Sequence, residues 1–290
     1  MRNVAPIVNI TINDSVAFFG CWGAGCQPDS GQWLLARDID ANPKIEAMIT
    51  AGDNFYEKYL PKEESKESFF HRNVDMCYAK DMYASLGNHD IELYNFERNH
   101  TMKNSRWILP AKNYIIHIND DIRVVMINTN PIFEEKAYKK YVENGEQLLE
   151  DDMKELNDFI DNLTPSNRIT IVVGHHPFLT NRHKLKEGKR TIDDRVRKII
   201  AKADLYICAD EHNLQHIVSD DLDEFILGGG GGDPDTTIIM DYPMETKFSY
   251  PYHGYGVFDV NNKKMSIRTL NEKTKEMEDS DYEYEVQKPH

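Results

Sequence analysis

The sequence predicts an α/β fold built around a largely parallel β-sheet. Short apolar runs of strand length alternate along the chain with longer segments that have helical character. Most of these runs end at a glycine or a polar cluster, which is typical of strand ends. Strands that alternate with helices indicate parallel pairing, because a crossover helix lets the next strand run in the same direction.

The N-terminal half supplies three expected strands. An apolar run at residues 16–20 predicts the first, and a turn-rich stretch leads from it into a helix over residues 31–48. The second strand ends at Gly52, and a helix over residues 65–79 then leads to the third strand at residues 82–86. Gly52 can take the sharp turn out of a strand because glycine has no β-carbon.

The rest of the chain repeats this alternation. Residues 114–118 and 123–127 predict two strands joined by a short polar turn. The clearest helix covers residues 145–163, where apolar side chains fall on one stripe. The remaining expected elements are a strand at residues 169–173, a helix at residues 196–203 and a strand at residues 205–208.

Composition indicates an ordinary globular protein. A length of 290 residues is enough for one large domain with an ample core. We expect that domain over residues 1–270, followed by an acidic tail at residues 271–290 that is disordered and solvated. Tyr282 and Tyr284 interrupt the acidic run, so the alternative is a contact surface for a partner.

Charge and cysteine content bear on partners and location. The net charge of −15 argues against a general nucleic-acid or membrane-surface binder. No apolar stretch is long enough to cross a membrane, and the N-terminus lacks the apolar region of a signal peptide. Four cysteines do not make a disulfide framework at this length, which favours a reducing compartment. We therefore expect a soluble, intracellular protein.

Polar clusters follow five of the expected strands. They lie after Gly20, at Asp53, at Asn88 and His89, at His175, and at residues 210–212. One such cluster is usually a turn or a cap, whereas ligand sites of α/β proteins gather at the carboxyl ends of several strands. Asp, Tyr, Asn and His are ligands of borderline to hard metal ions. The sequence therefore predicts an active site with metal-binding character.

The stretch Ala51-Gly52-Asp53-Asn54-Phe55-Tyr56 is central to this prediction. It brings a carboxylate and, three residues later, a phenol to the same strand end. A bridging carboxylate beside a phenolate suits a pair of hard metal ions. The alternative is a turn in which Asp53 caps the next segment and Tyr56 packs in the core.

A run of five glycines, residues 228–232, does not form a phosphate-binding motif. Asp233 follows the run where a dinucleotide-binding pattern needs glycine, and no Gly-Lys-Ser or Gly-Lys-Thr is present. The run either lets the backbone pass close to the site or forms a flexible loop.

The motifs in combination resemble the purple acid phosphatase branch of the calcineurin-like metallophosphoesterases, over nearly the whole chain. The matching blocks, in family order, are Gly52-Asp53-Asn54-Phe55-Tyr56, Gly87-Asn88-His89-Asp90, Gly174-His175-His176-Pro177 and His212-Asn213-Leu214-Gln215. The resemblance implies a four-layer αββα sandwich, in which two mixed β-sheets pack face to face between helices.

The same resemblance implies a hydrolase that cleaves phosphate monoesters at a dinuclear metal site. Asp53 would bridge the two ions, an iron paired with iron, zinc or manganese. Tyr56 and His212 would bind the first ion, and Asn88 and His175 the second. A metal-bound hydroxide would attack phosphorus in line with the leaving group.

Three further histidines take roles near the substrate in this interpretation. His89 would contact the phosphate and protonate the leaving alkoxide of a small phosphorylated substrate. His176 and His183 are candidates for substrate binding, although His183 is one residue off the family spacing. The alternative for His183 is an exposed loop histidine.

Two ligand positions depart from the family pattern. Cys21 stands where the family has the aspartate of Gly-Asp-Trp-Gly, and Asp210 stands where it has the first histidine of Gly-His-Asp-His. Asn128 also stands where relatives commonly have aspartate.

Two interpretations of these departures stay open. In the first, Cys21 and Asp210 still coordinate, and a soft thiolate shifts the active site towards zinc or ferrous iron. In the second, the site is degenerate, Cys21 is a small buried hydrophobe and Asp210 points to water. The fold would then serve binding or assembly.

Overall fold

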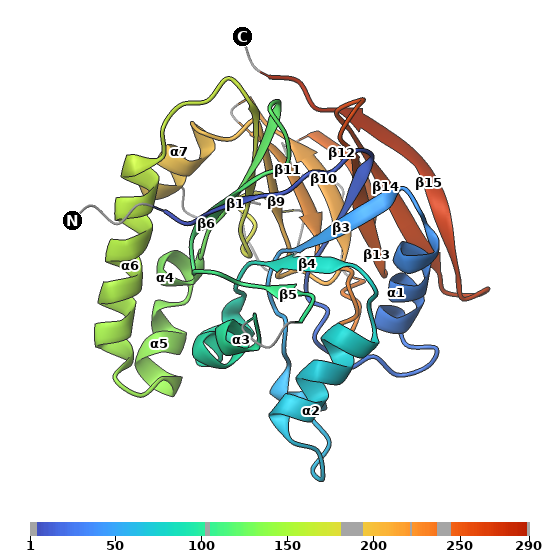
Figure 1. The fold of residues 1–290 in the computed structure, drawn as a ribbon, viewed down its shortest axis with the longest axis horizontal. Coiled ribbons are helices and arrows are strands. Elements are labelled where there is room, and N and C mark those ends of the chain that lie inside the picture. The colour runs from blue at the N-terminus through green and yellow to red at the C-terminus, as the bar shows by residue number, and fades with distance from the viewer. Residues whose placement is uncertain (1–4, 102–104, 181–193, 221, 237–244, 289–290) are drawn as a thin grey trace.

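Two mixed β-sheets pack face to face, with helices against their outer faces (Figure 1). The computed structural model describes residues 5–101, 105–180, 194–220, 222–236 and 245–288. His183 therefore lies outside the described residues. The αββα sandwich implied by the family resemblance is confirmed.

The larger sheet has eight strands. In spatial order they are β1 (Ile7–Asn9), β6 (Tyr114–His117), β7 (Ile122–Met126), β8 (Ile169–Val173), β9 (Leu205–Cys208), β11 (Asp223–Leu227), β10 (Leu214–Val218) and β12 (Glu245–Tyr250). Strands β7, β8 and β9 run parallel, so their carboxyl ends lie at one edge.

The smaller sheet has seven strands. In spatial order they are β15 (Glu276–Glu285), β14 (Lys264–Asn271), β13 (Gly254–Asp259), β2 (Ser15–Phe19), β3 (Ile45–Thr50), β4 (Asp81–Ala84) and β5 (Trp107–Ile108). Strands β2, β3 and β4 are parallel, so their carboxyl ends also lie together.

Helices flank both sheets (Figure 1). They are α1 (Gly31–Ala41), α2 (Lys66–His71), α3 (Tyr94–Thr101), α4 (Asn130–Phe133), α5 (Glu135–Tyr141), α6 (Gly145–Asn162) and α7 (Asp194–Ile200). A π-helix, η2 (Arg72–Met76), continues α2, and the short 3₁₀ helices η1 (Glu57–Tyr59) and η3 (Asn88–Asp90) follow β3 and β4. No helix in the described part of the chain is both long and apolar enough to span a bilayer.

Alternating side chains of the strands form two cores. Val124 of β7 belongs to the large core, which joins residues of both sheets, whereas Val125 packs in a second core with Leu156 and Ile160 of α6. This period-two alternation is what a strand buried on both faces requires. The two layers of packing hold the strand ends rigidly, and the polar clusters project from those ends.

Two expected helices in the N-terminal half end earlier than the sequence indicated. The helix begun at Gly31 ends at Ala41, because Asn42 caps it and Pro43 cannot continue the backbone hydrogen bonds. The helix expected over residues 65–79 is α2 followed by the π-helix η2.

The expected disordered C-terminal tail is wrong. Residues 276–285 form β15, which pairs antiparallel with β14 at the edge of the smaller sheet (Figure 1). Tyr282 and Tyr284 pack partly against the large core and contact His216. Along this acidic run the tyrosine rings are partly buried and the carboxylates between them stay in water, which is the alternation of a strand. The high charge of the run concealed this pattern in the sequence.

One pair of cysteines is bonded, which removes the basis for the reducing compartment that the sequence favoured. Cys26 and Cys77 form a disulfide, whereas Cys21 and Cys208 are free and buried. Disulfides persist mainly in oxidising compartments. The cysteine content therefore no longer favours a reducing compartment.

Candidate metal centre

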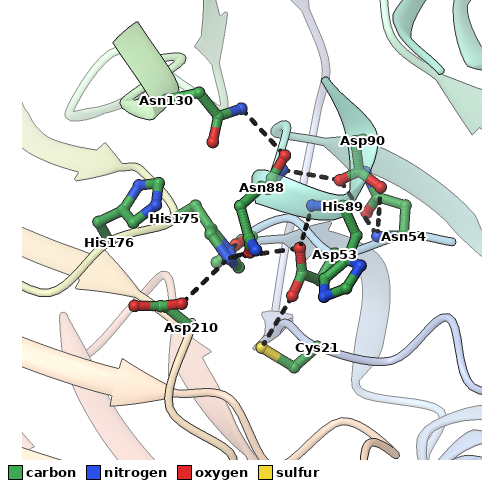
Figure 2. A network of polar contacts seen from close by, with 12 residues as sticks. Cys21, Asp53, Asn54, Asn88, His89, Asp90, Asn130, His175, His176 and Asp210 are labelled. Carbon is green, nitrogen blue, oxygen red and sulfur yellow. Dashed lines mark hydrogen bonds and ion pairs between the residues drawn. The ribbon is translucent and has the colours of Figure 1, made fainter. Parts of the chain in front are cut away.

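Asp53 stands at the centre of the polar clusters, at the carboxyl end of β3 (Figure 2). Its two carboxylate oxygens face different neighbours: Oδ1 accepts from the backbone N–H of His89 at 3.1 Å, and Oδ2 accepts from the hydroxyl of Tyr56 at 2.9 Å. The side chain is almost fully buried. Each oxygen can therefore serve a different half of one site.

The first half of the site contains Tyr56, His212 and Cys21. The Tyr56 hydroxyl lies 3.1 Å from Nε2 of His212, and Sγ of Cys21 lies 3.9 Å from Oδ2 of Asp53. His212 donates its Nδ1 proton to the carbonyl of Asp233 at 2.7 Å, since a carbonyl can only accept. Nε2 of the neutral ring therefore presents a lone pair to the site.

The second half surrounds His175 (Figure 2). Its Nε2 lies 3.1 Å from Oδ1 of Asn88, 3.4 Å from Oδ1 of Asp53 and 3.8 Å from Oδ1 of Asp210. Its Nδ1 donates to the carbonyl of Ala51 at 2.7 Å, so a neutral ring would place a lone pair among oxygen acceptors. Such a cluster of acceptors needs a proton or a cation between its members.

Electrostatics favour a positive charge at His175 and the neutral ring at His212. Burial alone would lower the pKa of His175, but the carboxylates of Asp53 and Asp210 outweigh burial and raise it. Burial lowers the pKa of His212, which keeps that ring in the neutral form that binds metal. Burial, and then the charge of Asp53, raise the pKa of Tyr56. A bound cation would stabilise the negatively charged form of such a ligand and so lower its raised pKa.

The two positions that depart from the family pattern both point into the site. Cys21 is fully buried, and burial followed by the charges of Asp53 and Asp210 raises the pKa of its thiol well above the usual value. Asp210 is largely shielded and lies within 3.8 Å of His175 rather than pointing away into water.

Unusual backbone conformations place three of these side chains. Cys21, Asp53 and Asp210 each have a left-handed φ, of 54°, 56° and 63°, and each follows the end of a strand. Left-handed non-glycine residues are strained and cluster at functional sites. The same turn geometry, repeated after β2, β3 and β9, aims side chains of both sheets at one point.

A buried network supports the loop that carries Asp53. Asp90 accepts from the backbone N–H groups of Gly87 and Asn54, at 2.7 and 3.0 Å. The Asn54 amide donates to Asp90 at 3.0 Å and to Glu97 at 3.2 Å. Burial, and then the charge of Asp53, raise the pKa of Asp90 to about 7. Sequence reasoning gave Asn54 and Asp90 no role; their places inside two family blocks were the only signal.

Two of the three histidines proposed to act near the substrate, His89 and His176, lie in the described residues. The His89 ring lies against the ring of Tyr56, with centroids 4.6 Å apart, so it borders the site. His176 is buried: its Nδ1 lies 2.7 Å from the hydroxyl of Thr129, and its Nε2 lies 3.4 Å from Glu134. A ligand atom of His176 nevertheless lies within 4.8 Å of those of His175 and Asp210, so the structure brings both His89 and His176 beside the ligand cluster.

The glycine run passes close to the site, as one of its two interpretations predicts. The N–H of Gly230 donates to the carbonyl of Gly20 at 3.0 Å, and that of Gly232 to the carbonyl of Cys21 at 2.8 Å. A β-carbon at Gly232 would collide with the His212 ring. Glycine is needed there because the backbone approaches a ligand side chain directly.

The fold and this arrangement of ligands define a metallophosphoesterase. Residues 15–214 match the calcineurin-like phosphoesterase family, and the chain belongs to it. The resemblance found in the sequence motifs is therefore confirmed.

Relatives place the chain in the purple acid phosphatase branch of that family. It is 28% identical to purple acid phosphatase 7 of Arabidopsis thaliana, across 86% of this chain and 80% of the relative. It is 24% identical to purple acid phosphatase 3 of the same plant, across 88% and 73%. Among solved structures, GAP50, the anchor in the inner membrane complex of Plasmodium, has a TM-score of 0.71 and 16% identity, covering 95% of this chain and 89% of that one. This last likeness concerns the fold alone.

Proposed function

We propose that this protein is a metal-dependent phosphatase whose centre holds two cations and hydrolyses phosphate monoesters. The observation that carries the proposal is the division of the Asp53 carboxylate between two groups of ligands. Oδ2 faces Tyr56 and Cys21, while Oδ1 lies beside Nε2 of His175. The relatives named as phosphatases support the same chemistry.

The hydrogen-bonding groups of the site fit the proposed cations. In the first half, the Tyr56 hydroxyl and the Cys21 thiol are the donors that face Asp53 Oδ2 and His212 Nε2, and all four atoms are possible metal ligands. Around His175, oxygen acceptors of Asn88, Asp53 and Asp210 surround one ring nitrogen. When bound, the cations would neutralise phosphoryl charge and lower the pKa of a neighbouring water molecule.

The chain's own residues supply positioning and a proton. His175 and His212 are held by backbone carbonyls through Nδ1, which fixes the ring orientation and the free nitrogen of each. His89 is exposed at the border of the cluster, where its ring can reach both water and a substrate. We assign it the protonation of the leaving alkoxide.

A second candidate function is binding or assembly without catalysis. The observation that favours it is that one position in each half of the site departs from the family pattern: Cys21 replaces an aspartate and Asp210 replaces a histidine. GAP50, the anchor in the inner membrane complex of Plasmodium, has the same fold and is a precedent for this candidate.

Metal analysis and turnover of p-nitrophenyl phosphate separate the two candidates. The phosphatase proposal expects about two equivalents of metal, visible absorbance if a ferric ion meets Tyr56, and turnover that a chelator abolishes. Colourless protein with little metal and no turnover would overturn it. The variant pair Cys21→Asp with Asp210→His then decides for the second candidate if it creates metal binding and activity that the wild type lacks. Asn99→Ala, an exposed change on α3, is the matched control.

A further inference from the structure

A second cluster of metal-ligating side chains lies where the π-helix η2 meets α3, and it shares no residue with the candidate metal centre. Oδ2 of Asp75 lies 2.8 Å from Nδ1 of His71 and 2.8 Å from Nε2 of His100. The three ligand atoms all lie within 4.8 Å of one another. His71 and Asp75 are four residues apart on the continuous α2–η2 helix, a spacing that puts two ligands on one face.

The carboxylate of Asp75 is oriented by its other oxygen. Oδ1 accepts from the hydroxyl of Ser105 and from the backbone N–H of Arg106, the latter at 3.2 Å. Oδ2 is thereby left to the two imidazoles. Hydrogen bonds of this kind to a ligating carboxylate fix its direction and are a regular part of metal sites.

Burial is graded across the cluster. The side chain of His100 is 5% exposed and that of Asp75 13%, whereas that of His71 is 55% exposed. The His100 ring is further held edge-on against Phe70, with centroids 5.0 Å apart. Two ligands are therefore preorganised inside the protein, and the third closes the cluster from the solvent side.

The backbone that carries Asp75 is itself unusual. Residues Arg72–Met76 form a π-helix, a rare conformation that recurs at functional sites. Here it turns Asp75 towards α3 and so towards His100. A single carboxylate oxygen of Asp75 lies 2.8 Å from a nitrogen of each ring, an arrangement that a cation can replace without moving any ligand far.

We propose that His71, Asp75 and His100 bind a divalent transition-metal ion of the zinc class. Two imidazole nitrogens and one carboxylate oxygen are a ligand set that such ions prefer over magnesium or calcium. The exposed side of His71 leaves the remaining coordination positions to water. The bound ion ties the α2–η2 helix to α3, which carries Glu97 of the network beneath Asp53.

Zinc stoichiometry with site-directed variants tests the proposal. Protein stripped of metal is dialysed against excess Zn²⁺, washed, and analysed for bound zinc. His71→Ala, chosen because His71 is exposed enough for the variant to fold, is expected to lose about one equivalent relative to wild type. His117→Ala, a histidine of β6 outside both clusters, is expected to lose none. Equal zinc content in wild type and His71→Ala overturns the proposal.

Anomalous scattering at the zinc edge gives an independent reading of position. The proposal expects a peak between His71, Asp75 and His100 in wild-type crystals, absent in Asp75→Asn. A Zn²⁺-saturated crystal without that peak shows only a hydrogen-bonded His–Asp–His cluster and overturns the proposal. Asp53→Asn keeps this peak even if it empties the candidate metal centre, so failure of the proposed function and failure of this inference are distinguishable.

Discussion

Nε2 of His175 and Oδ1 of Asn88 are 3.1 Å apart, and both are acceptors once Nδ1 of His175 has donated its proton to the carbonyl of Ala51. The two atoms repel unless a proton or a cation lies between them. The raised pKa of His175 corresponds to a proton between the two atoms. The family membership of the chain points to a cation in that place.

Metal removal is therefore expected to destabilise the protein more as the pH rises. Because the pKa of His175 is raised on folding, the stability contributed by its proton is complete below the ordinary value of 6.5 and is lost as the pH rises through the folded value. The melting temperature with and without chelator at pH 6 and pH 8 measures this. An equal chelator effect at both pH values would contradict it.

His89→Ala is expected to lower kcat by about 10²-fold or more, the usual contribution of a positioned proton donor. His89 makes only a ring contact with Tyr56 and a backbone hydrogen bond to Asp53. Metal content should therefore stay at the wild-type level. Turnover of p-nitrophenyl phosphate and metal analysis on the same sample give the answer, and a parallel loss of metal would show that His89 acts in binding instead.

Asn54→Ala is expected to destabilise the fold by about 3 kcal/mol or more, because it leaves several buried polar groups without partners. Among them are the indole N–H of Trp22, which donates to Oδ1 of Asn54 at 3.0 Å, and the carboxyls of Asp90 and Glu97. Denaturant unfolding of this variant beside Asn99→Ala, which should change stability by less than about 0.5 kcal/mol, is the measurement. Similar denaturation midpoints for the two variants would contradict the stabilising role of the hydrogen bonds of Asn54.

Replacing Cys26 and Cys77 together by serine is expected to cost up to about 4 kcal/mol, because their bond closes a long loop in the unfolded chain. The two cysteines are 51 residues apart in sequence. Mass spectrometry of the unreduced wild type should find two free thiols, those of Cys21 and Cys208. Four free thiols in freshly purified protein would contradict the structure.

The sequence predicted the parts of the fold whose pattern is local. Strands β8 and β9 have the predicted bounds, since each is a short apolar run between clear polar ends. The strands after residue 208 escaped prediction. In β15 carboxylates alternate with tyrosines, and only pairing with β14 gives that pattern a buried face.

The candidate metal centre was predictable for a different reason. Its ligands follow strands and lie within short motifs, so their convergence could be inferred from topology. The roles of Asp90 and Glu97 could not, because a buried carboxyl is defined by partners that lie far away in sequence. The same holds for His71 and His100, which are brought together by the packing of α2 against α3.

The edge position of β15 has a consequence for association between copies of the molecule. It is the outermost strand of its sheet, and one row of its backbone N–H and C=O groups has no neighbouring strand in the described part of the chain. Such a row is a template for edge-to-edge association. Here it carries the exposed side chains of Glu276, Glu278, Asp279, Asp281, Glu283 and Glu285. Two such edges repel each other at neutral pH and low salt, so acid or concentrated salt should bring the protein towards aggregation.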